Sequence, residues 1–98
     1  MKAALLLRQR VAVSEDAFAE LVLWSLPKPV AGSPHSYKYR LAFVVLGECV
    51  LRYDNEAGKG DHRHVGHVES GYRFVSVDRL ISDFMLDVRR WIDENGQT

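Results

Sequence analysis

The densest group of chemically active side chains in the sequence lies between Arg52 and His64. These thirteen residues hold eight ionisable groups besides a tyrosine. Histidine titrates near neutral pH and can exchange protons with a substrate. Arginine and lysine can hold a phosphate and stabilise the charge that develops on it. Cleavage of RNA without a metal needs this combination: a base for the 2′-hydroxyl, an acid for the leaving oxygen, and cations for the phosphorane-like charge.

Alternation along two predicted strands, residues 49–55 and 61–68, decides which of these side chains share a face, because side chains two positions apart point the same way. The predicted turn over residues 56–60 contains two glycines, which permit a positive φ or the close approach of another backbone. If that turn has five residues, the opposed pairs are Asn55 with Asp61, Asp54 with His62, and Arg52 with His64. Opposed residues have Cβ atoms about 4.5–5.5 Å apart, so Asp54 would be placed to orient a ring nitrogen of His62.

A cationic sheet face follows if the turn at Gly47 has an odd number of residues. Lys38 and Arg40 then join the face of Arg52, while apolar residues form the opposite, core face. That core set is Tyr39, Leu41, Phe43, Leu51 and Tyr53. The predicted catalytic residues are His62, His64, Asp54 and Asp61. The predicted phosphate-binding residues are Lys38, Arg40, Arg52, Lys59 and Arg63. Neither a metal nor a cofactor is predicted.

Simpler roles stay open for the histidine cluster. A histidine opposite an aspartate on a hairpin often makes only a cross-strand hydrogen bond, so a structural role for His62 is as well supported as a catalytic one. Asp61, His62 and His64 lie close together in sequence, as zinc ligands can. A second ligand pair is missing, however, and Cys49 is expected on the core face. The pattern therefore disfavours a structural zinc.

Loop and aromatic residues also have non-catalytic interpretations. His35 and His67 adjoin loop signals and are expected to be solvated. Residues 58–60, Gly-Lys-Gly, are not a P-loop, because the Gly-x4-Gly-Lys-Ser/Thr pattern and its following helix are missing there. The aromatic residues of one strand parity would be able to stack nucleobases, but such a stripe is more typical of a core packed against a helix. They are Tyr37, Tyr39, Phe43 and Tyr53.

Five strands and one helix must position these residues. Period-two alternation predicts strands over residues 3–13, 18–26, 37–46, 49–55 and 61–68. Apolar residues at helical spacing predict a helix over residues 76–93, with Ser76 as its N-cap. The apolar stripe of that helix must dock on the sheet. The predicted fold class is α+β: an antiparallel sheet of four to five strands with a C-terminal amphipathic helix packed on one face, in a single domain over residues 1–98.

Composition limits the function classes further. The 98 residues are 47% hydrophobic and 27% charged, which argues against intrinsic disorder. Thirteen basic residues balance thirteen acidic ones, so a uniformly basic surface is excluded although a local basic patch is not. One cysteine makes no internal disulfide, no apolar run approaches a membrane span, and the apolar start is too short for a signal peptide. We therefore expect a cytoplasmic protein without a membrane partner, and a homodimer or a tight partner would add stability to so small a domain.

Three stretches carry a resemblance to a known family. They are residues 37–41, Tyr-Lys-Tyr-Arg-Leu; residues 52–56, Arg-Tyr-Asp-Asn-Glu; and residues 58–64, Gly-Lys-Gly-Asp-His-Arg-His. Together with the opening strands, the Tyr-Arg-Phe before the helix and the Asp-Val-Arg-Arg-Trp near the end, they resemble the TumE-like family. Its members are small bacterial and archaeal toxins of type II toxin–antitoxin modules. The resemblance implies a cytoplasmic toxin that a cognate antitoxin neutralises.

Two hypotheses follow from these observations. In the first, the chain is an RNA-directed toxin, an endoribonuclease with histidine acid/base groups, in which Asp54 or Asp61 orients an imidazole. In the second, the same basic sheet face is a non-catalytic module that binds nucleic acid or a protein. An antitoxin rich in carboxylates is expected to cover the cationic face. It would leave the outer face of the helix free, and Asp83 and Asp87 are expected there.

Overall fold

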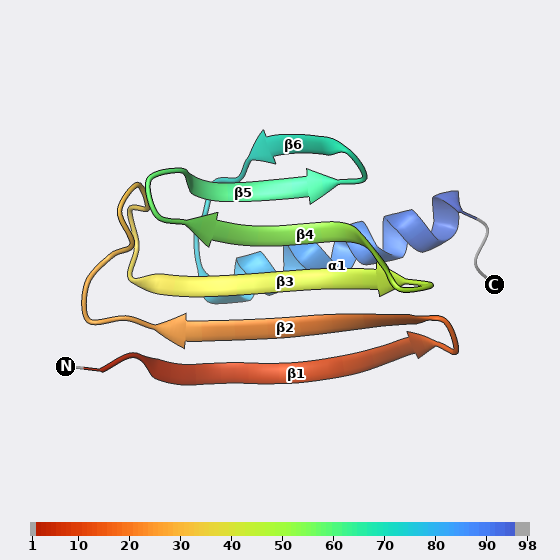
Figure 1. Cartoon of the computed structure of the whole chain (residues 1–98), viewed down its shortest axis with the longest axis horizontal. Helices are drawn as coiled ribbons and strands as arrows, with labels where there is room; N and C mark the ends of the chain where they lie inside the picture. Colours follow the sequence, from red (N-terminus) through yellow and green to blue (C-terminus); the bar gives the residue numbers. More distant parts are fainter. Residues whose placement is uncertain (1, 96–98) are drawn as a thin grey trace.

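The computed structural model describes residues 2–95, which form six strands and one helix. The strands are β1 (Ala4–Ser14), β2 (Ala17–Ser25), β3 (Tyr37–Val45), β4 (Glu48–Glu56), β5 (Gly60–Val65) and β6 (Val68–Gly71), and the helix is α1 (Val77–Glu94). All neighbouring strands are antiparallel, and the order in the sheet is the order in the chain (Figure 1). The α+β prediction is confirmed, with six strands where four to five were predicted.

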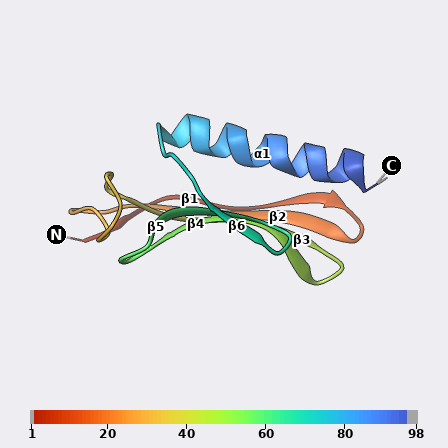
Figure 2. The same ribbon diagram turned by 90° about the horizontal axis from the view of Figure 1, so that it is seen from above.

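The molecule has two layers, and α1 lies across one face of the sheet (Figure 2). The period-two pattern of β3 explains this, because Tyr39, Leu41 and Phe43 all point toward the helix and are fully buried. The helix contributes Leu80, Phe84 and Val88 to the same core. The opposite face carries no second layer, and we call it the open face. It holds the alternate side chains of β1–β5, including Arg8, Val22, Arg40, Asp54 and His62, which occupy one row across the sheet.

The helix begins and ends where its capping residues indicate. The side chain of Ser76 accepts a hydrogen bond from the backbone N–H of Arg79 at 3.1 Å, as an N-cap does. At the other end, the backbone N–H of Asn95 donates to the carbonyl of Trp91. The helix therefore begins directly after the predicted N-cap, Ser76, and ends one residue beyond the predicted range of residues 76–93. No helix within residues 2–95 combines the length and the apolar character that a membrane crossing requires.

The predicted strand over residues 61–68 is wrong in its second half. The chain turns at Gly66 and His67, where Gly66 takes a positive φ of 60°, and returns as the short strand β6. All four residues of β6 are exposed. Because β6 buries nothing, its residues carry no hydrophobic alternation that would separate them from β5 in the sequence.

The cationic face forms, but by a different route from the one predicted. The β3–β4 turn has an even length of two residues, Leu46 and Gly47, both with positive φ. A register shift follows, because Phe43 pairs with Leu51 whereas Val44 pairs with Cys49. The bulged extra residue supplies the odd count that aligns the two strands. The same bulge makes Cys49 exposed, so its predicted place on the core face is wrong.

Two loops at one end of the sheet dock backbone against backbone. The N–H of Gly58 donates to the carbonyl of Ala31 at 2.6 Å. Gly60 has a φ of +77°, and a Cβ there would lie 2.8 Å from the carbonyl oxygen of Gly32. The glycines of the β4–β5 turn thus serve both predicted purposes, positive φ and close approach. This contact ties the loop over residues 26–36 to the turn that carries Lys59.

Candidate functional site

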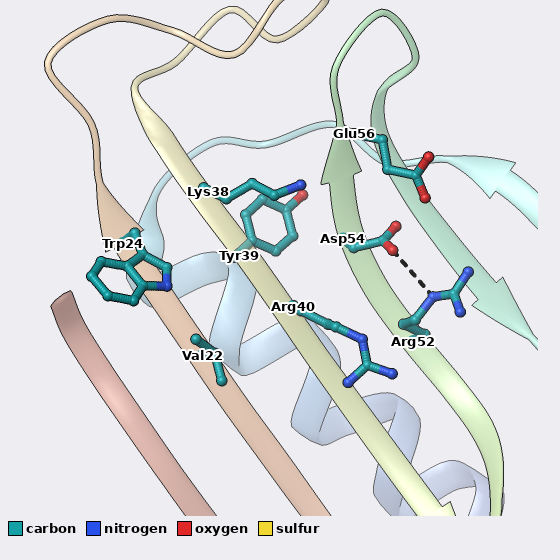
Figure 3. Close-up of a pocket in the computed structure, with 8 residues that line it drawn as sticks. All are labelled: Val22, Trp24, Lys38, Tyr39, Arg40, Arg52, Asp54 and Glu56. Carbon is teal, nitrogen blue, oxygen red and sulfur yellow. Dashed lines mark ion pairs between the residues drawn. The ribbon is translucent and has the colours of Figure 1, made fainter. Parts of the chain in front are cut away.

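A pocket of about 390 Å³ opens on the open face, above β2, β3 and β4 (Figure 3). Its lining residues are Val22, Trp24, Lys38, Tyr39, Arg40, Arg52, Asp54 and Glu56. Three of the five predicted phosphate-binding residues and one predicted catalytic residue therefore gather here. We call this hollow the open-face pocket.

Arg40 is the exposed cation of the open-face pocket. It stands directly opposite Asp54 in the β3–β4 register, yet no ion pair to Arg40 is formed within residues 2–95. Lys38 differs, because its Nζ donates to the backbone carbonyl of Asn55. The guanidinium of Arg40 is thus available to an anion, and Lys38 contributes a second cation to the same pocket.

Asp54 is a buried carboxylate on the floor of the pocket. Its Oδ2 lies 3.1 Å from Nε of Arg52, and the two are joined in Figure 3. Its Oδ1 is buried and has no hydrogen-bond partner. Arg52 and Asp54 therefore form an ion pair, but the N–H of Nε is not aligned for a hydrogen bond to the carboxylate. The carboxylate therefore holds the Arg52 guanidinium in place through Oδ2, while Oδ1 can still accept a hydrogen bond.

Arg52 also contacts His64, its register partner on β5. Its Nη2 lies 3.1 Å from Nε2 of His64, and that same nitrogen lies 3.1 Å from Oε2 of Glu69. One ring nitrogen cannot serve both neighbours in one protonation state. Neutral Nε2 accepts from the guanidinium, and protonated Nε2 donates to the carboxylate. The site thus provides a partner for each protonation state of His64, as an acid/base group requires.

His62 lies opposite Asp54 as predicted, but the expected hydrogen bond between them is missing. Nε2 of His62 instead donates to the backbone carbonyl of Lys59 at 2.8 Å. Nδ1 is buried without a hydrogen bond and lies 3.8 Å from Glu69. The β4–β5 turn, rather than Asp54, therefore orients this imidazole. The side chain of Lys59 is exposed on that turn, 3.9 Å from Glu56.

Arg63 does not belong to the cationic face. Strand parity places it on the helix side of β5, where its Nε lies 2.8 Å from Oδ2 of Asp87. Tyr53 donates its hydroxyl to the same oxygen. Asp87 is therefore buried between sheet and helix, and its predicted place on the outer face is wrong. Asp83 is not free either: hydrogen bonds from Tyr72 and Arg79 hold its pKa below the usual range.

Asp61 likewise faces the helix side and contacts neither candidate histidine. Its Oδ2 accepts from the hydroxyl of Tyr39 at 2.6 Å and lies 2.7 Å from Nε2 of His35. His35 also stacks on Phe74, with ring centroids 3.9 Å apart. The prediction that His35 is solvated is wrong, since its side chain is 9% exposed. This network fixes the loop over residues 26–36 and leaves no zinc site with His62 and His64.

Burial and the hydrogen bond to Asp61 raise the pKa of Tyr39 well above its usual range. The phenol is therefore a permanent donor to the buried carboxylate. Because the network lies under Phe74 on the helix side, we assign it a structural role. His67 is exposed in the β5–β6 turn, as predicted. Within the described part of the chain, no three His, Cys, Asp or Glu side chains converge as a metal site would require.

Sequence reasoning missed three residues of the open face. Arg8 and Arg10 of β1 lie in the same rows as Arg40 and Arg52, and Trp24 of β2 pairs with Lys38. Arg10 donates to Glu20 at 2.8 Å and lies over the ring of Phe18. All three can be predicted from strand parity, if the face assigned to each residue of β3 is extended to its register partners on β2 and β1.

The fold and the site together define a small α+β protein with a cationic, uncovered sheet face. The sequence matches the toxin TumE family over residues 2–92, and the chain belongs to that family. Comparisons with curated proteins and with solved structures gave no match.

Proposed function

We propose that this toxin acts in the cytoplasm as a metal-independent endoribonuclease that a cognate antitoxin neutralises. The observation that carries the proposal is the contact between Arg52 and His64 beside Arg40 and Asp54. It combines a cation held in place by a carboxylate with a proton-exchanging group on one uncovered face. Family membership supports the toxin, and the chemistry of the face favours a phosphodiester.

The proposed reaction uses the 2′-hydroxyl of RNA as nucleophile. Arg40 and Arg52 hold the phosphate, and neutral Nε2 of His64 takes the 2′-hydroxyl proton. The 2′-oxygen bonds to phosphorus and the bond from phosphorus to the 5′-oxygen breaks. His62, as an imidazolium, gives the proton on Nε2 to that leaving oxygen in place of the Lys59 carbonyl. The products are a 2′,3′-cyclic phosphate and a 5′-hydroxyl. The strand rise of about 3.3 Å per residue separates the two histidines by about 6.6 Å, room for one phosphate between them.

Neutralisation by an antitoxin follows from the same surface. Arg40 offers an exposed charge, and buried cations without partners are costly. An antitoxin that covers the open-face pocket must therefore bring carboxylates to it. The contact between these carboxylates and Arg40 would both bind the antitoxin to the toxin and block the phosphate site.

The test is cleavage of a labelled RNA by purified toxin in the presence of EDTA. We expect His64→Ala to lower the single-turnover rate by about 10²–10⁴-fold, the usual contribution of general acid–base catalysis. The matched control is His67→Ala, a histidine exposed in the β5–β6 turn, which should leave the rate unchanged. If the RNA stays intact with wild-type toxin but binds with a strong salt dependence that Arg40→Ala reduces, the face is a binding module and not a catalyst.

A further inference from the structure

Trp24 is an aromatic side chain without an aromatic partner. Eight of the ten aromatic residues pack against other rings; Trp91, for example, lies 5.6 Å from Phe43 in an edge-to-face pair. Phe18 lies instead under the guanidinium of Arg10. Trp24 instead lines the open-face pocket (Figure 3). Within residues 2–95 its indole stacks on no ring and its N–H donates no hydrogen bond. Packing in the core therefore does not account for this half-buried tryptophan, and its place in a charged pocket indicates a role in binding.

The surroundings of Trp24 divide into an apolar part and a cationic part. Val22, two residues earlier on β2, and Leu5, its register partner on β1, make the surface around the indole apolar. Lys38 is its register partner on the other side, and Arg40 follows two residues along β3. Both side chains extend from β3 toward β4 in Figure 3, so the pocket has a flat apolar side at Trp24 and a cationic side beyond it. A nucleotide has the complementary parts, a planar base joined to an anion.

We propose that Trp24 is a stacking platform for an unpaired nucleobase, so that the toxin takes single-stranded RNA. This inference rests on the proposed function, because it assumes that Arg40 holds a phosphate of the same strand. Base–aromatic stacking tolerates any base, since every base has a π-face. The toxin would therefore bind single-stranded RNA in preference to double-stranded RNA. A base inside an A-form duplex is stacked on its neighbours and cannot lie flat on an indole in a sheet pocket.

Trp24 has one competing role that the test must separate. Tryptophan is a common anchor in protein interfaces, so the indole would also suit an antitoxin side chain. The cations beside it favour the nucleotide, because a protein anchor pocket is usually desolvated and depleted of free charge at its centre. The Arg40 guanidinium of the same pocket is exposed and makes no ion pair within the described residues.

The experiment measures both affinity and indole fluorescence. Trp91→Phe leaves Trp24 as the single tryptophan, and the probe is a 2′-O-methyl RNA oligomer that resists cleavage. Two matched probes have the same phosphate count: an abasic oligomer and a fully paired duplex. We expect the single strand to quench Trp24 and Trp24→Ala to weaken its binding about tenfold or more, with Trp24→Phe retaining most of the affinity. Binding of the abasic oligomer and the duplex should change less than twofold.

The outcomes distinguish this inference from the function on which it rests. If wild-type toxin binds all three probes through Arg40 but Trp24→Ala changes none of them, the stacking platform is wrong and RNA binding stands. If Trp24→Ala weakens binding of the abasic oligomer as much as binding of the intact one, the indole supports the structure of the pocket and does not stack on a base. The proposal is then also wrong. If it weakens only antitoxin binding, Trp24 is a protein anchor. If no probe binds to wild-type toxin, the proposed function itself is overturned.

Discussion

Arg52 and His64 face each other across β4 and β5, with Nη2 of the guanidinium 3.1 Å from Nε2 of the ring. Since they act on the same phosphate in the proposed reaction, their removal should not be additive. We expect Arg52→Ala and His64→Ala each to lower cleavage by about 10²-fold or more, and the double variant to be no slower than the worse single variant. Single-turnover cleavage in a double-mutant cycle measures this. Fully multiplicative losses would show that the two residues act separately.

Charge reversal on the open face should weaken the antitoxin complex. Arg40→Glu places a carboxylate where we expect an acidic partner, so affinity should fall at least tenfold at low salt and less at high salt. The matched control is Arg89→Glu, the same change at an exposed position of α1. Titration calorimetry of each variant at two salt concentrations checks this. A loss with Arg89→Glu and not with Arg40→Glu would place the antitoxin on the helix side.

The side chain of Asn55 takes the place of backbone hydrogen bonds between β3 and β4. Its Oδ1 accepts from the N–H of Tyr39 at 3.0 Å, and its Nδ2 donates to the carbonyl of Tyr37 at 2.7 Å. Asn55 is fully buried, so Asn55→Ala leaves both backbone groups without partners. We expect a loss of about 2–4 kcal/mol in the free energy of unfolding, from about 1–2 kcal/mol per orphaned group. Urea denaturation with an unchanged m-value would support this; a loss under 1 kcal/mol would contradict it.

Two glycines in one turn offer a matched test of loop docking. Gly58 and Gly60 both have positive φ, but a Cβ on Gly58 meets nothing within 4 Å, whereas one on Gly60 meets the Gly32 carbonyl at 2.8 Å. Gly58→Ala should cost about 1–2 kcal/mol, the penalty of the left-handed region alone. Gly60→Ala should cost more, because the loop over residues 26–36 must move. Equal thermal unfolding midpoints for the two variants would show that the loops do not depend on this contact.

High pH should destabilise the protein through its buried tyrosines. Burial and hydrogen bonds to Asp61 and Asp87 raise the pKa of Tyr39 and of Tyr53 above the usual range. A raised folded pKa gives stability that is complete below the unfolded pKa of about 10 and is lost as the pH rises above it. We expect urea midpoints to fall between about pH 10 and pH 11, and Tyr53→Phe to flatten that fall. A slope unaffected by the substitution would assign the alkaline transition to other groups.

The parts of this fold that alternation governs could be predicted from sequence, and the parts set by distant contacts could not. The predicted β4–β5 register is correct because the glycine-rich turn and strict parity leave little freedom, although Glu56 and Gly60 pair and the turn itself has only three residues. The bulge at Val50 could not be predicted, since one unpaired residue leaves the hydrophobic pattern almost intact. His35 was misplaced because its partner Asp61 lies in another hairpin, and a loop histidine carries no local sign of burial. Arg63 was assigned by its charge although its parity already placed it on the helix side.

The hairpin order of the sheet also bears on how the protein folds. Four of the five strand connections have two or three residues, and the β2–β3 loop has eleven. The entropy lost in closing these loops is small, so the sheet can assemble by successive local steps. The docking of α1 joins residues far apart in the chain, because α1 follows all six strands in the sequence. Because β1–β5 build the open face, that face reaches its register before the helix seals the core. An antitoxin present during synthesis would therefore meet its surface early and stabilise the unfinished sheet by mass action.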